Sequence, residues 1–336
     1  MTAISARSGH PRPLTLVVTV DTEEEWDWSG PFPTAPFSTR NVQRLSKFQA
    51  LCDRIGLKPT YMVDYAVACD PNTAQLLAPA IESGRCEIGA HLHPWCNPPF
   101  EEAICEENSH IVNLPRALVA RKLRNLTRIL EERFGTRPRT FRAGRWGMTG
   151  ELLMLLRDHG YETDSSVLPY YTSTSFSYIN APIRPYWPEF GDLLAEGTQR
   201  EIIEFPATSA FNRANFPLAY RVHDLVSRPA LRALRPTAIL WHTRLLRRLH
   251  LSPELCSASQ MWHCARPVLA AGGTFLNLFL HSSSFLPGCT PYVADAAGEQ
   301  RLYERVERFW TILKASAPSA VGRTLSEART VWTKEG

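Results

Sequence analysis

Short apolar segments alternate with longer segments of helical periodicity along most of the chain, and this order strongly limits its fold. Strands are predicted at 14–20, 59–63, 86–91, 140–142, 162–164, 202–205 and 274–281. Helices are predicted near 39–55, 72–83, 115–134, 149–159, 259–271 and 299–314. Continuous apolar runs suit strands covered on both faces, and strands separated by helices form βαβ units. The pattern therefore predicts an α/β fold, an open or incomplete TIM-like (β/α)7 barrel rather than a closed eightfold one.

Polar side chains stand at the carboxyl ends of five predicted strands, namely Asp21, His91, Arg142, Asp164 and His281. Parallel α/β folds build their active sites at this edge of the sheet. We therefore expect these five residues to gather at one site.

Two pairs of residues at this edge have the spacing of metal ligands. His91 and His93 are two residues apart, and so are Asp21 and Glu23. Alternate residues of an extended chain point to the same side, so each pair can face one point. Two histidines and a carboxylate around one point are typical of a catalytic metal site with open positions. The sequence therefore predicts a metalloenzyme.

The composition narrows the partners and the location. The net charge of +4 over 336 residues is too small to indicate a nucleic-acid partner, and no apolar run has the length of a membrane span. The N-terminal segment lacks the apolar core of a secretory signal, so a cytoplasmic location is expected. The eight cysteines form no CxxC pair, which favours reduced thiols over a cysteine-based zinc site. Nothing in the sequence indicates an oligomeric state.

The domain organisation follows from the same pattern. We expect a disordered N-terminal tail at 1–13, one barrel domain at 14–320 and a C-terminal tail at 321–336, with a basic helical insertion near 206–258. Within the insertion, residues 221–251 carry seven arginines and one acid, with leucine, isoleucine and tryptophan between them. One interpretation is a solvated helical face over the barrel. The other is a peripheral contact with anionic lipid at the inner face of a membrane, or with a lipid-phosphate substrate.

Five short blocks carry a resemblance to a known family. They are TVDTEEEW, EIGAHLHPW, FRAGRWG, YETDSSV and LNLFLHSSSF, and they occur in the family's order between about residue 14 and about residue 290. With them the chain resembles the polysaccharide deacetylases, the NodB-homology carbohydrate esterases, and most of all the intracellular subgroup tied to lipopolysaccharide and exopolysaccharide assembly. The resemblance implies a distorted (β/α) barrel that removes N- or O-acetyl groups with one divalent metal ion.

In the first two blocks the resemblance implies a general base and a metal site. Asp21 matches the family's base, and Thr22 stands where a metal-binding aspartate is usual. Glu23 is the natural substitute because it shares a face with Asp21, while the neighbouring acids at 24 and 25 remain alternatives. His91 and His93 are assigned as the other ligands. Zinc is the expected ion, with cobalt, iron, nickel and manganese as alternatives.

In the later blocks the resemblance implies the remaining catalytic groups. Arg142 matches the arginine that orients the base, and the backbone N–H of Arg145 stands where the family stabilises the oxyanion. His281 matches the general acid, and Asp164 matches the aspartate that tunes it. The walls of the site are expected to include an acyl pocket and sugar-stacking platforms, formed by Leu278, Leu280, Trp95 and Trp146.

These residues predict a metal-dependent hydrolase. It would remove an N-acetyl or related acyl group from a sugar or lipid-linked saccharide in cell-surface polysaccharide biosynthesis. The alternative is an inactive sugar-binding or regulatory protein on the same scaffold, suggested by the altered first and second blocks. A non-haem iron oxygenase would pair one histidine with a carboxylate two residues away, unlike this chain. A Rossmann or P-loop enzyme is disfavoured because no glycine-rich phosphate motif follows the first strand.

Overall fold

A curved parallel sheet forms the centre of the molecule in the computed structural model, which describes residues 13–334. The path runs through β9 (Phe275–His281), β1 (Thr15–Thr22), β2 (Pro59–Val63), β3 (Glu87–Leu92), β4 (Thr140–Ala143), β5 (Thr163–Asp164) and β6 (Ile203–Glu204). All seven predicted strands are present, and the predicted incomplete (β/α) barrel is confirmed. The expected tail at 1–13 lies, except for Pro13, outside the described residues.

The gap between β6 and β9 is bridged by irregular backbone rather than by an eighth strand. Thr208 donates its N–H to the carbonyl of Asn277 at 3.1 Å, and Phe279 donates to the carbonyl of Leu251 at 3.0 Å. Leu251 in turn donates to the carbonyl of Thr208 at 2.9 Å. These single contacts hold the two edges of the sheet together, which accounts for the distortion of the barrel.

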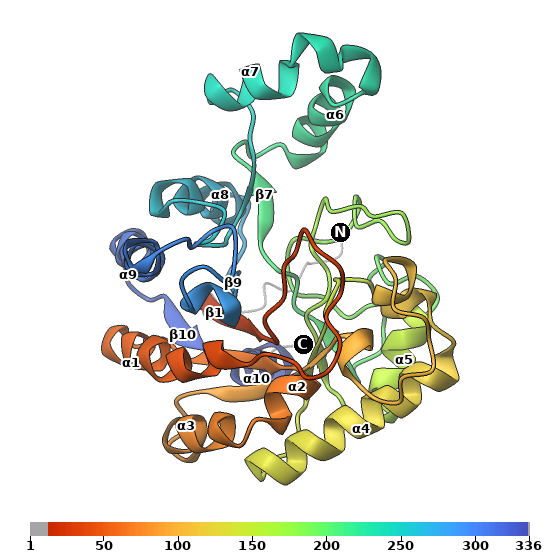
Figure 1. The fold of residues 1–336 in the computed structure, drawn as a ribbon. Helices are drawn as coiled ribbons and strands as arrows, with labels where there is room; N and C mark the ends of the chain where they lie inside the picture. The colour runs from red at the N-terminus through yellow and green to blue at the C-terminus, as the bar shows by residue number, and fades with distance from the viewer. Residues whose placement is uncertain (1–12, 335–336) are drawn as a thin grey trace, which may run out of the picture.

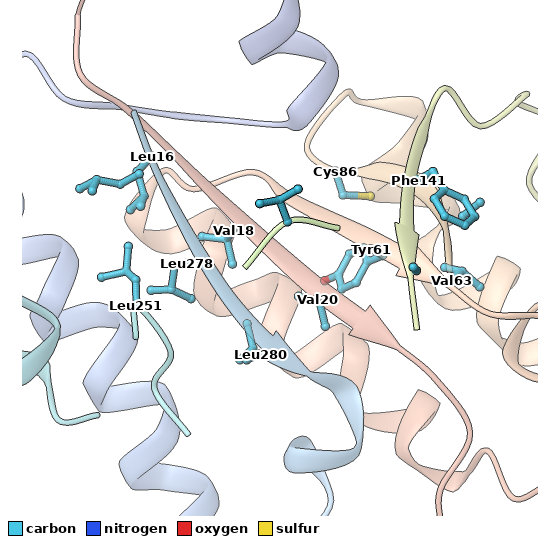
Figure 2. Packing of buried hydrophobic residues seen from close by; sticks show 14 of the residues in the cluster. Leu16, Val18, Val20, Tyr61, Val63, Cys86, Phe141, Leu251, Leu278 and Leu280 are labelled. Atoms are coloured by element: carbon cyan, nitrogen blue, oxygen red, sulfur yellow. The ribbon is translucent and has the colours of Figure 1, made fainter. Parts of the chain in front are cut away.

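Helices cover the outside of the sheet, where the largest apolar cluster lies. They are α1 (Leu45–Ile55), α2 (Tyr65–Cys69), α3 (Pro71–Glu82), α4 (Arg116–Phe134), α5 (Gly150–Asp158), α8 (Ala258–Ala270) and α9 (Ala296–Ser316) (Figure 1). Leu16, Val18 and Val20 of β1 join this cluster, as Figure 2 shows. Because side chains alternate along a strand, Val17, Thr19 and Asp21 then face the barrel interior.

The C-terminal residues contradict the expected tail at 321–336. β10 (Val321–Arg323) pairs with the first residues of β1, up to Val17. β2 pairs with the same edge of β1 from Val18 onward. α10 (Leu325–Lys334) begins beside the first residues of β2 and β3, where the Leu325 N–H donates to Thr60 Oγ1 at 3.0 Å. Its Leu325, Ala328 and Trp332 are buried against inward-facing strand residues. This segment therefore closes the end of the barrel opposite the site.

The insertion forms an antiparallel pair of strands that carries two helices. β7 (Ser209–Phe211) pairs with β8 (Arg248–His250), and α6 (Phe216–Val226) and α7 (Pro236–His242) lie between them in the chain. We call residues 212–247 the arm, because these helices project away from the barrel (Figure 1). No helix in the described part of the chain is long and apolar enough to cross a membrane. The expected cytoplasmic location stays a prediction.

Candidate metal centre and catalytic residues

Three buried side chains at the carboxyl edge of the sheet converge as metal ligands would. Glu23 follows β1, His91 lies near the end of β3, and His93 follows it. Glu23 Oε2 lies 3.5 Å from His91 Nε2 and 3.4 Å from His93 Nε2, too far for hydrogen bonds. Zinc–ligand bonds of about 2.0–2.1 Å separate tetrahedral ligand atoms by roughly 3.3–3.4 Å. The spacing of this set therefore fits a small divalent ion.

His91 supplies the strongest test of this fit. Both of its ring nitrogens are buried and have no hydrogen-bond partner among the described residues. An unpartnered buried nitrogen is costly unless another group, such as an ion, satisfies it. Gly144 makes room for the second histidine, because a Cβ at this position would collide with the His93 ring.

The far side of His93 is held by a second carboxylate. Its Nδ1 lies 3.1 Å from Glu24 Oε2, an arrangement that fixes the tautomer and orientation of ligating histidines. Burial by itself would lower the pKa of His93, yet the Glu24 charge outweighs this and the pKa is raised. Trp95 donates to Glu24 and stacks on His93, with ring centroids 4.2 Å apart. The expected role of Trp95 as a sugar platform is therefore wrong, because His93 covers its face and it is 3% exposed.

The neighbouring acids are already engaged, which leaves Glu23 as the candidate carboxylate ligand. Glu24, Asp64, His93 and Cys96 form a second buried group. Asp64, however, accepts backbone N–H groups from Val67 at 2.7 Å and from Glu24 at 3.1 Å. Burial and then the adjacent Glu24 charge raise the pKa of Asp64 well above its usual range, which favours its protonated form. This group therefore supports His93 rather than a second ion. Glu25 binds Arg40 instead.

The candidate base lies beside the ligands and is paired with a fully buried arginine. Arg142 Nη1 donates to Asp21 Oδ1 at 2.6 Å, and the guanidinium also donates to Thr19 and twice to Ser165. Burial alone would raise the pKa of Asp21, but Arg142, with His91 and His281, lowers it below its usual value. Asp21 is therefore ionised at neutral pH and held in one orientation.

The candidate acid has a different partner from the one expected. His281 Nδ1 lies 3.0 Å from Glu254 Oε2, and its Nε2 lies 3.8 Å from Asp21 Oδ2. Burial opposes the charged form, but Glu254 and then Glu23 and Asp21 raise the pKa of His281 to about 10. Its imidazole is therefore protonated at neutral pH. Glu254 lies in the loop after β8, a strand that the sequence did not predict, so no sequence signal indicated it.

The prediction that Asp164 tunes His281 is therefore wrong. Asp164 accepts a hydrogen bond from Ser166 at 2.6 Å and forms a buried carboxyl pair with Glu204. Burial, and then the Asp164 charge, raise the pKa of Glu204 well above its usual range. The raised pKa values of both carboxyls favour protonation of the pair, and its hydrogen-bond partners are Ser166 and the backbone N–H of Val167 rather than His281.

A cavity of about 380 Å³ opens over these groups. Glu23, His93 and His281 line it together with an aromatic wall formed by Trp26, Trp28, Trp146, Tyr171, Phe279 and Tyr292. The Trp28 ring meets His281 edge-on at 4.8 Å. Trp26 and Trp28 follow the three glutamates at 23–25 in the sequence, and this position could have predicted part of the aromatic wall. Aromatic faces of this kind suit the apolar faces of sugar rings.

The structure places the remaining predicted wall residues differently. Leu278 and Leu280 are fully buried in the outer cluster (Figure 2) and do not line the cavity. They alternate with Phe279 and His281, which face it, so the expected acyl pocket formed by the two leucines is wrong. Trp146 does line the cavity, packed edge-on against Phe279 at 5.3 Å. Arg145 also lines it, while its side chain pairs with Glu106 at 2.6 Å.

Comparisons with known proteins define the fold. No family model matches the chain, and no curated protein matches it. A structure provisionally described as a polysaccharide deacetylase from Mycobacterium smegmatis aligns with a TM-score of 0.54 at 15% identity, covering 98% of this chain and 95% of that one. A provisionally described glycoside hydrolase/deacetylase from Parabacteroides distasonis aligns with a TM-score of 0.59 at 11% identity, covering 96% of this chain and 71% of that one.

An allantoinase aligns with a TM-score of 0.50 at 14% identity over 100% of this chain and 97% of that one. The protein therefore has the fold of the polysaccharide deacetylases. Because a protein named allantoinase shares this fold, the substrate has to be argued from the site.

Proposed function

We propose that the protein is a metal-dependent hydrolase that removes an acetyl or related acyl group from an N-acylated sugar. One observation carries this proposal. Two members of the candidate ligand set, Glu23 and His93, line the same aromatic cavity as the protonated His281, and the buried, ionised Asp21 lies 3.8 Å from His281. Amide hydrolysis needs these parts, namely an activated water, a stabilised oxyanion and a proton for the leaving amine.

Each residue has a defined task in this reaction. Glu23, His91 and His93 would hold one divalent ion, which lowers the pKa of bound water and polarises the acyl carbonyl. Asp21 accepts the proton of the attacking water, and Arg142 keeps this carboxylate ionised and oriented. The backbone N–H of Arg145 is the candidate oxyanion donor.

The leaving amine receives its proton from His281, which lines the cavity. His281 Nε2 lies 3.8 Å from Asp21 Oδ2, so the acid and the base stand beside one another, and Glu254 holds the other ring nitrogen. The His281 imidazolium donates its Nε2 proton as the C–N bond breaks. Zinc is the proposed ion. The proposed substrate is a sugar or lipid-linked saccharide intermediate of cell-surface polysaccharide synthesis.

The test measures acetate release from a panel of N-acetylated mono- and oligosaccharides after loading with zinc or cobalt. Asp21→Asn and His281→Gln should each lower kcat by about 10²–10⁴-fold, the usual value of a positioned base or acid. His159→Gln, at the far end of α5, is the control and should keep full activity. Sugar binding without turnover by the metal-loaded protein would contradict the proposal and favour a sugar-binding protein.

A further inference from the structure

The cavity over the metal centre borders a second cavity beneath the arm. The second cavity has a volume of about 370 Å³ and is lined by Leu240, Trp241 and Leu246 among others. Both cavities share Arg248, His250 and Leu255. We call the second cavity the arm groove. An elongated molecule can therefore reach from the metal ligands into apolar surroundings past Arg248.

Arg248 stands at this junction without a counter-charge. It lies on β8, where it and His250 face the cavities while Leu249 between them is buried. Its Nη1 donates to the Tyr170 carbonyl at 2.7 Å, and no carboxylate pairs with it among the described residues.

The other arginines near the metal centre differ in this respect. Arg142 is paired with Asp21, and Arg145 with Glu106. A partly buried guanidinium with free donors is suited to bind a phosphate or carboxylate in forked geometry. His250 adds a second polar group at the junction, because its buried Nδ1 has no partner among the described residues.

The arm above the groove has the surface of a lipid-binding element. Seven of the eleven exposed large hydrophobic side chains in the described chain lie in or beside it, at 218, 222, 225, 234, 239, 245 and 255. Arginines are interspersed among them, with Asp224 as the one acid between 221 and 251. Exposed apolar side chains among cations complement an anionic lipid surface. The groove is lined by residues of an element suited to the membrane from which a lipid-linked substrate would come.

We infer that Arg248 binds an anionic phosphate that links the acylated sugar at the metal centre to a hydrocarbon chain in the arm groove. This inference rests on the proposed function and specifies its substrate class. The sugar would lie against the aromatic wall, the phosphate at the junction, and the first part of the chain against Leu240, Trp241 and Leu246. A neutral, soluble N-acetyl sugar would fill only the first of these three positions.

The first experiment compares three probes with the metal-loaded protein: N-acetylglucosamine, N-acetylglucosamine 1-phosphate and farnesyl-phosphoryl N-acetylglucosamine. The measured quantity is the ratio of kcat/KM for each phosphorylated probe to that for the neutral sugar. Arg248→Gln should lower this ratio about 10- to 100-fold, as expected for the loss of hydrogen bonds to a charged group. Arg248→Lys should keep most of the wild-type ratio. Arg308→Gln, which alters an exposed arginine of α9 outside the arm, should leave the ratio unchanged.

The outcomes separate the parts of the inference. An unchanged ratio in active Arg248→Gln overturns the phosphate subsite and leaves the proposed hydrolase standing. Equal kcat/KM for the sugar phosphate and its farnesyl ester overturns the hydrocarbon part and identifies a soluble sugar phosphate as the source of the anion.

The second experiment needs no turnover. It measures binding of farnesyl phosphate by calorimetry. Binding that is lost in Arg248→Gln and kept in Arg308→Gln supports the subsite, even if the protein releases no acetate. Equal binding by all three proteins overturns it.

Discussion

Replacing Glu254 by glutamine should move the alkaline limit of activity. The carboxylate lies 3.0 Å from His281 Nδ1, and it also accepts hydrogen bonds from the His281 backbone N–H and from Ser284. Glutamine has the same shape and can keep the latter two contacts through its oxygen. The substitution therefore removes the charge that faces the imidazole with little change in packing.

The size of the effect follows from the contact. A hydrogen bond to a charged group contributes about 1.5–3 kcal/mol, and a pKa changes by one for about 1.4 kcal/mol. The pKa of His281, about 10 in the native protein, should therefore fall by about 1 to 2 in Glu254→Gln. A general acid works below its pKa, so activity is present at lower pH and is lost as the pH rises through this value. The alkaline limb should move to lower pH by the same amount.

The assay is the pH dependence of kcat/KM together with an NMR titration of the His281 ring, which needs no substrate. Glu299→Gln is a matched control, because Glu299 is a buried carboxylate bound to Lys47 away from the site. An alkaline limb that stays in place in Glu254→Gln, while the NMR titration of His281 shifts, would show that His281 is not the acid. An unshifted titration would refute the assignment of Glu254 as its partner.

Three further predictions concern the framework of the site. Arg142→Met should lower the free energy of unfolding, measured in urea titrations, by about 3–5 kcal/mol, because it leaves Asp21 charged and unpaired. The control Arg139→Met alters an exposed arginine and should lower the free energy of unfolding by less than about 1 kcal/mol. Leu280→Ala should lower the free energy of unfolding by about 2–5 kcal/mol and leave kcat/KM unchanged. Phe279→Ala should lower kcat/KM, and the reverse pattern for the two variants would contradict the assigned faces of β9. Deleting 321–336 should yield insoluble protein or a large fall in Tm, and an unchanged Tm would refute the role of α10 in closing the barrel.

The strands and the site residues that end them could be predicted because both obey local rules. Continuous apolar runs define buried parallel strands, and the edge at which they end collects Asp21, His91, Arg142 and His281. The alternation of side chains along an extended chain was sufficient to bring His93 and Glu23 to the same point. The same alternation, applied to β9, would have excluded Leu278 and Leu280 from the cavity.

Residues set by tertiary packing could not be predicted in this way. Glu254 reaches His281 because the insertion folds back over β9, and no local pattern reports such a contact. Asp164 ends a strand as expected, yet its neighbour Glu204 engages it instead. The C-terminal helix did carry a signal, since Leu325, Ala328 and Trp332 are spaced three and four residues apart, as on one face of a helix. β10, with three residues, is too short to show a strand pattern.

The most direct test of the metal centre is the metal content of purified protein, measured by mass spectrometry beside the binding of added zinc and cobalt. We expect about one divalent ion per chain in the wild type, much weaker binding in Glu23→Gln, and none in the His91→Ala, His93→Ala double variant. Glu25→Gln, which alters an acid bound to Arg40, should keep the wild-type content. A folded wild-type protein that binds no ion, or a double variant that binds as well as the wild type, would contradict the account.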